Sequence, residues 1–398
     1  MPMPAMRDAS RPRRPVSRIV VALAIAVAVL LIAACGSSGG SSSSSGGGSS
    51  SGSGGGSTLS AGDKAGLAKA EAFLAEYEAQ PTQITSTGKI TKPIPKGLTV
   101  DFITCGATPE CTQEGQIVTQ ADTLLGWKTV VLNNDGTPAS QKANFSQVVR
   151  SKANAVLYSA IPAATFASEL PALRANGTFI AACCITDPVD ATTGIGYGVG
   201  LASQVAPVAG GQAAFVAADS KDTASSLFVN IPDLEILNVQ LKYYEDAMAG
   251  YCPTCQVAAL DVALANVGNA PSTVVSYLRS HPSVKYVVAS TDAITIGLSA
   301  AIKAAGLTGI KIVGQGATPT NLVYLHSGEQ AADVAFPYYE ELYSMVTAVA
   351  QHAAGLPVTP SVPAPEWILT PSNAPTSTQA FPLVPGYEAQ YKALWGLG

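Results

Sequence analysis

The sequence has few charged residues and no excess of positive charge. Only 12% of its 398 residues are Asp, Glu, Lys or Arg, and 22 basic residues face 27 acidic ones, for a formal net charge of −5. A nucleic-acid-binding protein needs a cationic surface that attracts phosphate groups. The charge balance therefore argues against nucleic acid as a partner, whereas the 47% of apolar residues are enough for a large core.

Catalytic and cofactor signatures are also missing. The sequence contains no G-x-S-x-G, P-loop or H-E-x-x-H motif and no dinucleotide-binding fingerprint. Its three histidines, His281, His326 and His352, are scattered, and no Cys, His and carboxylate set has the spacing of a zinc site. We therefore expect no enzyme active site, no metal ion and no cofactor.

The apolar run near the N-terminus is too short for a membrane-spanning helix, which takes roughly 20 residues. It extends from Ile19 to Ala34, has 16 residues and follows five arginines. It ends in Ile-Ala-Ala-Cys, which is similar to the bacterial lipobox, where the signal is cut before the cysteine and the cysteine receives lipid. We therefore expect a lipoprotein signal peptide at 1–34 and lipid on Cys35, at the outer face of the bacterial cytoplasmic membrane. A short uncleaved anchor is the alternative.

A low-complexity segment follows this signal. Residues Gly36 to Ser57 are all Gly or Ser, a composition that cannot bury apolar area and behaves as a flexible coil. We expect residues 35–58 to form a tether that lets the folded part search the space above the membrane. A spacer through a cell wall is the simpler interpretation, and the two are compatible.

Beyond the tether, predicted strands alternate with predicted helices. The apolar spacing of residues 62–80 predicts a helix; it opens a lead-in over 59–95, and we expect it to pack on the first domain. Short apolar and β-branched runs predict the strands. In the first half these strands are 98–104, 128–133, 155–159 and 178–182, and the helices between them are 113–125, 139–151 and 163–176.

The second half repeats this order. Its predicted strands are 225–230, 256–262, 285–290 and 310–314, and its helices are 204–218, 234–249, 271–280 and 294–305, before a helix at 338–354 and a strand near 367–369. Buried strands that alternate with helices form parallel sheets with helices on both faces. The predicted fold class is therefore α/β, with two doubly wound parallel-sheet domains.

Several stretches carry a family resemblance. They include KGLTVDFIT, NAVLYSAIP and the segment from Ser280 to Pro319, whose order of helix, strand, acidic turn, helix, strand and glycine turn is the most specific part. Over residues 96–357 the chain resembles type I periplasmic-binding proteins of the ribose-binding branch. The resemblance implies two domains joined by a three-strand hinge, which close on a solute in the cleft between them and deliver it to an ABC transporter.

The domain limits follow from this resemblance. We expect an N-terminal lobe made of residues 96–202 plus about 336–356. The C-terminal lobe would then consist of residues 203–335 plus the C-terminal tail, 357–398.

The loops after the strands are where we expect the cleft residues, because ligands of open α/β sheets bind at the carboxyl ends of the strands. Simpler explanations stay open, since Ser and Thr at strand ends also cap helices and a carboxylate such as Asp292 is favourable before a helix in any case. Tyr338 and Tyr339 are adjacent, so at most one of them would face the cleft. The candidate ligand-binding residues are Thr104, Cys105, Thr108, Ser159, Cys184, Thr186, Asn230, Asp292, Gln315, Phe336 and Tyr338.

The chain departs from the sugar binders of this family at two points. Their glycine turn reads Gly-x-Asp, whereas this sequence has Gly-Gln-Gly at 314–316, and the Asp-Arg pair expected after the fourth strand is replaced by Cys-Ile-Thr-Asp at 184–187. Sugar hydroxyls are usually held by charged groups, because a buried polar group without a partner costs about 1–3 kcal/mol. We therefore expect a sugar-like solute that is less polar or is held differently.

Six cysteines remain beside Cys35, an even number, and an exported chain is expected to form disulfides. Cys252 and Cys255 resemble a redox CxxC motif. That motif opens a helix, where the helix N-terminus activates the thiol, whereas this pair follows a helix and leads into a strand. We therefore expect a structural disulfide between them.

The other four cysteines allow three pairings. Cys105 with Cys111 is the simplest, and it leaves Cys183 with Cys184. A vicinal disulfide needs a distorted peptide, because consecutive Cα atoms are about 3.8 Å apart and disulfides prefer about 4.4–6.8 Å. Crosses such as Cys105 with Cys184 therefore stay open.

Together these features predict a lipid-anchored extracytoplasmic solute-binding protein of an ABC importer, and not an enzyme. We expect a monomer that closes on a small molecule and whose partners are the transporter permease and, through lipid on Cys35, the membrane. A ligand-sensing lipoprotein that feeds a signalling receptor and a wall or adhesion lipoprotein are the alternatives.

Overall fold

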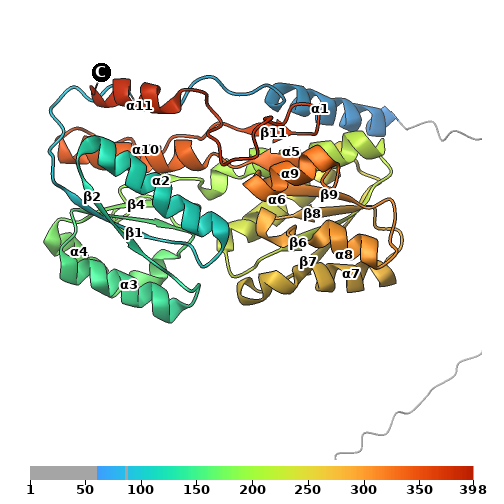
Figure 1. Ribbon diagram of the computed structural model, residues 1–398, viewed down its shortest axis with the longest axis horizontal. Coiled ribbons are helices and arrows are strands. Elements are labelled where there is room, and N and C mark those ends of the chain that lie inside the picture. The colour runs from blue at the N-terminus through green and yellow to red at the C-terminus, as the bar shows by residue number, and fades with distance from the viewer. Residues whose placement is uncertain (1–60, 86–87, 398) are drawn as a thin grey trace, which may run out of the picture. The chain divides into compact units, whose positions relative to one another are not determined.

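The computed structural model describes residues 61–85 and 88–397, which form two lobes, each built on one sheet with helices on both faces (Figure 1). The expected signal peptide, the lipidation site Cys35 and the tether lie outside the described residues. Within the described part, no helix is both long and apolar enough to cross a membrane.

The first lobe contains five parallel strands in the order β2-β1-β3-β4-β5, with helix α10 (Tyr338–Ala353) packed on the sheet. Helices α2 and α3 each begin at a proline that follows a capping threonine, a favoured way to start a helix. The other elements of this lobe are β1 (Thr99–Ile103), α2 (Pro109–Leu125), β2 (Lys128–Leu132), α3 (Pro138–Ser151), β3 (Ala155–Ser159), η1 (Ala163–Phe166), α4 (Leu170–Asn176), β4 (Phe179–Cys183) and β5 (Tyr197–Val199).

The second lobe contains six strands in the order β11-β10-β9-β8-β6-β7, and β11 runs antiparallel to β10. Its elements are η2 (Ala202–Gln204), α5 (Ala206–Ser220), β6 (Ser225–Asn230), α6 (Glu235–Tyr251), β7 (Gln256–Asp261), η3 (Leu264–Asn269), α7 (Ala270–Ser280), β8 (Tyr286–Ala289), η4 (Asp292–Ile294), α8 (Leu298–Ala304), β9 (Lys311–Gly316), α9 (Pro319–Ser327), β10 (Ala332–Ala335) and β11 (Trp367–Leu369).

Both sheets share one strand order, because β7-β6-β8-β9-β10 repeats β2-β1-β3-β4-β5. Strand β1 pairs with β2 on one side and β3 on the other, which places Ile103 beside Leu132 and Tyr158. Strand β6 lies in the same way between β7 and β8. In sheets of this order the connections reverse direction at these strands, and the ligand crevice forms at their carboxyl ends. The predicted α/β class with two parallel-sheet domains is confirmed.

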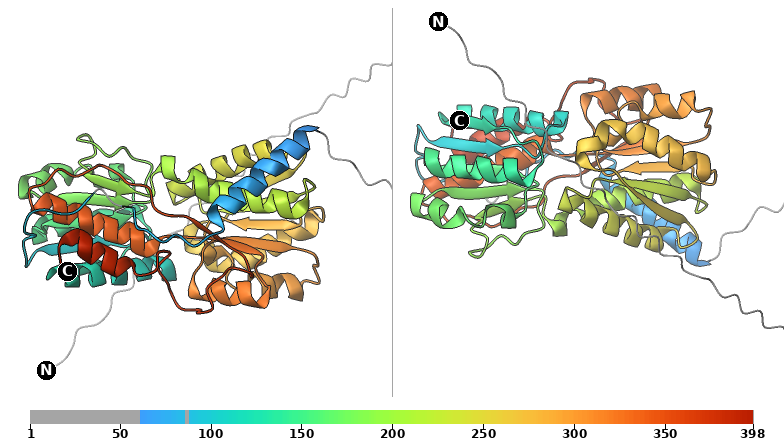
Figure 2. Two further views of the ribbon diagram at one scale, coloured as in Figure 1. Left: turned by 90° about the horizontal axis from the view of Figure 1, so that it is seen from above. Right: turned by 90° about the horizontal axis from the view of Figure 1, so that it is seen from below.

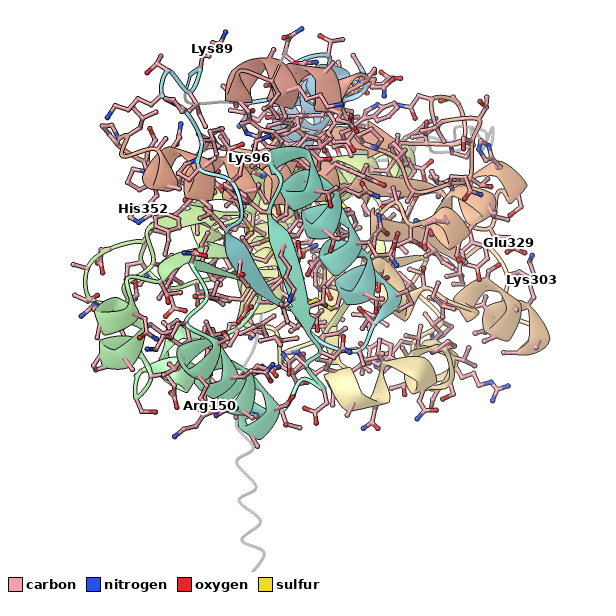
Figure 3. The ribbon with its side chains drawn as sticks, turned by 60° about the vertical axis from the view of Figure 1, so that its left-hand side comes forward. Lys89, Lys96, Arg150, Lys303, Glu329 and His352 are labelled. Atoms are coloured by element: carbon pink, nitrogen blue, oxygen red, sulfur yellow. A yellow bond between two sulfur atoms is a disulfide. The ribbon has the colours of Figure 1, made fainter. Side chains whose placement is uncertain are left out.

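The apolar core lies against both faces of each sheet. In the first lobe Phe145, Tyr158 and Phe166 are fully buried, with the two phenylalanine rings stacked 4.0 Å apart. The charged side chains labelled in Figure 3 lie on the outer surface, where Lys303 and Glu329 form an ion pair at 2.8 Å.

The first described helix, α1 (Ala61–Tyr77), packs against α5 and α6 of the second lobe (Figure 2). Our expectation that it packs on the first domain is therefore wrong. Gly66 explains the contact, because a Cβ at this position would lie 2.3 Å from Tyr251 O, so α1 approaches the end of α6 only with glycine there. Ala70 of α1 is fully buried in the same interface.

The last helix, α11 (Tyr387–Trp395), packs against α10 of the first lobe (Figure 1), whereas we expected the whole tail 357–398 to complete the second lobe. Trp395 Nε1 donates a hydrogen bond to Thr347 Oγ1 at 2.9 Å, and the Trp395 ring is parallel to that of Tyr343 at 5.7 Å. The tail is thus shared: β11 joins the second sheet, and α11 covers the first lobe.

Two strands, β5 and β10, and two α-helices, α9 and α11, are absent from the sequence prediction, as is the short helix η3. Strand β5 is short and lies in a glycine-rich segment, and β10 carries the buried Asp333, so neither has a clear strand pattern. The helix predicted over 163–176 is instead two helices, because a new helix, α4, begins at Leu170 with Pro171 in its first turn.

Candidate functional site

A cleft lies between the two lobes, at the carboxyl ends of their strands. It encloses about 920 Å³, part of which is open to solvent. Loops of both lobes and the segment that leads from β10 into α10 contribute to its walls. Seven of the eleven candidate residues line it: Cys105, Thr108, Ser159, Cys184, Gln315, Phe336 and Tyr338.

Four glutamates that are not among the candidate residues also line the cleft: Glu110, Glu114, Glu341 and Glu366. Glu110 and Glu114 are four residues apart at the start of α2, so helix geometry places them on one face. This spacing directly after a strand-end loop is the signal that could have found them. No Lys, Arg or His is among the described residues that line the cleft.

Glu114 is buried, with 4% of its surface exposed, and its Oε1 accepts a hydrogen bond from Ser159 Oγ at 3.1 Å. Burial raises the pKa of Glu114 to about 8, because water no longer stabilises the charged form. Glu114 Oε2 and Glu110 Oε2 have no hydrogen-bond partner in the described part of the chain. We call the part of the cleft lined by Glu110, Glu114, Glu341 and Glu366 the acidic wall. It therefore holds carboxyl oxygens that could accept further hydrogen bonds.

The six described cysteines form three disulfides: Cys105 with Cys111, Cys183 with Cys184, and Cys252 with Cys255. The simplest predicted pairing is thus the one that forms. The Cys105–Cys111 disulfide closes the first cleft loop, and both residues line the cleft. Cys252 and Cys255 lie elsewhere, where Cys255 Sγ accepts a hydrogen bond from Ala224 N at 3.2 Å.

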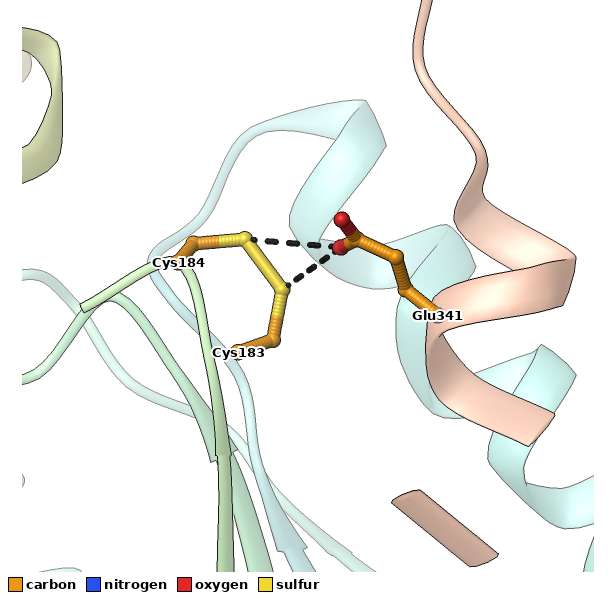
Figure 4. Close-up of side chains that lie close together, drawn as sticks. All are labelled: Cys183, Cys184 and Glu341. Atoms are coloured by element: carbon orange, nitrogen blue, oxygen red, sulfur yellow. Dashed lines mark hydrogen bonds between the residues drawn. A yellow bond between two sulfur atoms is a disulfide. The ribbon is translucent and has the colours of Figure 1, made fainter. Parts of the chain in front are cut away.

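The vicinal disulfide of Cys183 and Cys184 stands beside Glu341 of α10 in the cleft wall (Figure 4). Glu341 Oε2 lies 3.0 Å from Cys183 Sγ and 3.8 Å from Cys184 Sγ. Disulfide sulfur carries no proton, so the carboxyl group must donate in this contact. Burial, and then the charges of Glu366 and Glu114, raise the pKa of Glu341 well above its usual range, which keeps that proton in place.

Gly200 lets the crossover after β5 pass close to this group. Its φ is +61°, and a Cβ there would lie 3.1 Å from Glu341 Oε1 and 3.2 Å from Cys184 N. Cys183, Cys184 and Glu341 are close enough to hold a metal ion. The disulfide offers no thiolate to bind one, however, so in this oxidised form the group is a structural part of the wall.

Asp292, a candidate ligand residue, does not line the cleft. It is fully buried, and its carboxylate accepts hydrogen bonds from Gln315 N at 3.2 Å and Thr318 N at 3.0 Å. Burial, and then the charge of Asp292, raise the pKa of the adjacent Asp333 well above its usual range, so Asp333 remains protonated beside Asp292. Asp292 therefore acts through Gln315, by fixing the loop that carries it into the cleft.

The glycines at 314–316 leave room for this carboxyl pair. A Cβ at Gly314 would lie 2.5 Å from Asp292 Oδ1 and 2.8 Å from Asp333 Oδ2, and Gly316 has a φ of +141°. The departure from the Gly-x-Asp pattern thus leaves a turn built on buried carboxyl groups, with Gln315 as its polar side chain at the cleft.

Three further candidates, Thr104, Asn230 and Thr186, also do not line the cleft. Thr104 Oγ1 accepts a hydrogen bond from Asn134 N at 3.0 Å, so it joins two loops of the first lobe. Asn230 Nδ2 donates to Asn238 Oδ1 at 2.8 Å within the second lobe. These side chains support the cleft loops from behind.

Thr186 instead takes part in a contact between the lobes at the cleft rim. Its Oγ1 donates to Glu235 Oε2, at the start of α6, at 2.9 Å. Leu264 of the second lobe lies against two glycines of the first lobe, Gly106 and Gly136. A Cβ added to Gly136 would lie 3.0 Å from Leu264 Cδ2, and a Cβ added to Gly106 would lie 3.6 Å from the same atom. The lobes therefore touch across the mouth of the cleft, which is narrow in this conformation.

The second lobe gives the cleft a largely apolar wall. Leu234, Leu237 and Leu264 contribute to it. Phe336 and Tyr338, whose ring centroids are 4.6 Å apart, stand where the chain returns to the first lobe. The cleft can therefore hold a solute with its hydrogen-bond donors toward the acidic wall and its carbon skeleton against the opposite one.

Sequence comparison gives one family. A family model described as a periplasmic binding protein domain matches residues 111–357. No curated protein matches the sequence.

Solved structures with the same fold are numerous. An ABC sugar transporter subunit from Rhodobacter sphaeroides 2.4.1 is 18% identical, with a TM-score of 0.62 over 70% of this chain and 99% of that chain. The Caulobacter myo-inositol binding protein, bound to myo-inositol, is 18% identical, with a TM-score of 0.63 over 72% and 98%. A Mycobacterium smegmatis protein in complex with β-D-fucofuranose is 17% identical, with a TM-score of 0.63 over 75% and 98%. At these identities the likeness establishes the fold alone.

Replacing Asp292 by Asn should destabilise the protein, because an amide offers one acceptor oxygen where the carboxylate serves two backbone N–H groups. We expect a loss of about 1–3 kcal/mol in the free energy of unfolding by urea, the cost of a buried donor without a partner. Asp246→Asn, at an exposed ion pair with Lys242, is the matched control and should change it by less than about 0.5 kcal/mol. Equal losses in the two variants would contradict this account of Asp292.

The solute-free protein should become less stable as the pH rises from about 5 to 8. The pKa of Glu114 is raised from 4.5 to about 8 in the fold, so between these values the folded state holds a proton that the unfolded state releases. Its contribution is therefore complete below about pH 4.5 and is lost as the pH rises toward 8. Thermal unfolding at several pH values measures this slope. Glu114→Gln should flatten it relative to the exposed control Glu245→Gln, and identical slopes would refute the assignment.

Proposed function

Because the chain belongs to the periplasmic binding protein family, we propose that it is the lipid-anchored receptor of an ABC importer, which closes its two lobes on a sugar-like small molecule. Proteins of this family bind solutes outside the cytoplasm and are not enzymes. The observation that carries the proposal is the cleft of about 920 Å³ between the lobes, lined from both sides by strand-end loops.

The composition of the cleft supports a solute rich in hydrogen-bond donors. Glu110 and Glu114 offer free carboxyl oxygens, and Gln315 is a polar side chain at the opposite lobe. Hydroxyl groups donate to carboxylates in strong, charge-assisted hydrogen bonds. The solved structures with the same fold include proteins bound to myo-inositol and to β-D-fucofuranose. A polyhydroxylated solute fits both the free carboxyl oxygens of the cleft and the kind of ligand bound in these two structures.

Lobe closure is the proposed mechanism of capture. The contacts of Thr186 with Glu235 and of Leu264 with Gly136 stand at the rim, where they form only when the lobes approach each other. Segments that connect two lobes can absorb such a rotation as a hinge. Solute held between the walls would add contacts to both lobes and so favour the closed form.

The location and partners belong to the same proposal. Lipid on Cys35 and the Gly/Ser tether would hold a monomeric receptor at the outer face of the cytoplasmic membrane. From there the closed, solute-loaded form would dock on the membrane permease of the importer. Neither a cofactor nor a metal ion enters this cycle.

A solute panel tests the proposed function. The protein is unfolded and refolded to remove carried-over solute, and its thermal unfolding is then measured with sugars, polyols, amino acids, nucleosides and aromatic acids. A solute at about a hundred times its Kd adds about 2.7 kcal/mol, so we expect at least one sugar or polyol to raise the Tm by several degrees. The bound solute should be recovered chemically unchanged.

The variant Gln315→Ala should weaken binding of that solute several-fold, because Gln315 stands at the cleft and is 8% exposed. The exposed Gln379→Ala is the matched control and should bind as the parent does. Silence across the whole panel and across amino sugars added to it, or conversion of a solute into product, would contradict the proposed function.

A further inference from the structure

The first-lobe wall of the cleft gathers four carboxyl groups and, among its described residues, no cation. Glu110 and Glu114 come from α2, Glu341 from α10, and Glu366 from the segment before β11. Glu110, Glu114 and Glu341 are 7%, 4% and 3% exposed, so all three are more than nine-tenths buried. Because no cation is among the described residues that line the cleft, the wall offers no partner for the charge of anionic solutes such as sugar acids and sugar phosphates.

Three of these glutamates keep an oxygen with no donor. Glu110 Oε2, Glu114 Oε2 and Glu366 Oε2 are shielded from water and have no hydrogen-bond partner in the described part of the chain. Glu341, by contrast, is engaged with the vicinal disulfide. A buried carboxyl oxygen without a donor is costly. A solute with hydrogen-bond donors would satisfy these oxygens.

The groups around Glu114 indicate whether the donor group of the solute is neutral or positively charged. Glu110 lies on the same helix, Ser159 at the end of β3, and Glu341 and Tyr338 on α10. None of these groups carries positive charge. A neutral polyol would satisfy the oxygens and leave the buried carboxyl groups protonated, whereas a cation would also compensate the charge of a carboxyl group that ionises.

We propose that the solute is an organic cation whose protonated amine binds between Glu110 and Glu114 and whose carbon skeleton packs on the apolar second-lobe wall. An ammonium group offers three donors and no acceptor, which matches the unpaired oxygens of the wall. Leu234 and Leu237 give the skeleton an apolar surface, and Tyr338 gives the cation an aromatic neighbour. This inference rests on the proposed function and narrows its solute class to amine-bearing, sugar-like molecules.

Binding of such a cation would favour the charged form of Glu114, whose pKa burial raises to about 8 in the solute-free protein. Part of the carboxyl population therefore loses its proton when the amine enters. Binding at pH 7 would release protons to the buffer, which calorimetry detects when the same titration is repeated in buffers of different ionisation heat.

Matched pairs of probes test the inference by titration calorimetry at pH 7. The pairs are D-glucosamine with D-glucose, D-galactosamine with D-galactose, and 1-amino-1-deoxysorbitol with sorbitol. We expect at least one amine to bind about tenfold or more tightly than its neutral partner, with proton release. Glu114→Gln and Glu110→Gln should each weaken that amine about tenfold, since each removes one charge and keeps the side-chain shape.

The control variant is Glu245→Gln, which is exposed on α6 outside the cleft and should bind as the parent does. Circular dichroism melts of all three variants separate a binding defect from misfolding. Neutral partners that bind as tightly as the amines, or an amine affinity unchanged in Glu114→Gln, would overturn the inference and leave the proposed function standing. Absence of binding by every probe and by every solute of the panel above would overturn both.

Discussion

The burial of carboxyl groups without a cation is the constraint on which the cleft is built. Such a group is costly unless it keeps its proton or receives hydrogen bonds. Asp292 receives two backbone N–H groups, and Asp333 beside it keeps its proton. Glu341 keeps its proton against the vicinal disulfide. At Glu110 and at Glu114 the described part of the protein leaves one carboxyl oxygen without a hydrogen-bond partner. In our proposal, a donor group of the solute binds to these oxygens.

The fold brings these groups together and also ties the lobes at their outer ends. Both sheets have the same strand order, so both present their carboxyl ends to one cleft. Helix α1 belongs to the second lobe although its chain continues into β1 of the first, and α11 belongs to the first lobe although it follows β11 of the second. The described residues of the segments 78–85, 88–98 and 370–386 therefore also connect the lobes. Any closing motion must be absorbed there as well as in the inner crossovers.

The sequence was sufficient to predict the framework, because buried strands and amphipathic helices follow local rules of periodicity. It was also sufficient for those cleft residues that directly follow a predicted strand, such as Ser159. Asp292 follows this rule in sequence but does not line the cleft. Pairing of β8 with β9 brings Thr318 next to it, and pairing of β9 with β10 brings Asp333. Strand β10 was not predicted, so the pair of Asp292 with Asp333 could not be foreseen.

The acidic wall was missed for a different physical reason. Glu110 and Glu114 lie on a helix, where a carboxylate near the N-terminus is favourable with or without a ligand. Only the structure shows that they are buried and unpaired. Glu341 and Glu366 reach the cleft from the last part of the chain, 231 and 256 residues after Glu110. No local pattern could assign them to the same wall.

Closure of the two lobes on one solute is the central claim, and small-angle X-ray scattering tests it most directly. The scattering of solute-free protein is compared with that of protein saturated with the solute that raises its Tm most. The account predicts a decrease in the radius of gyration on binding, to a curve that agrees with the narrow cleft described here. A radius of gyration that stays the same at saturation would contradict it.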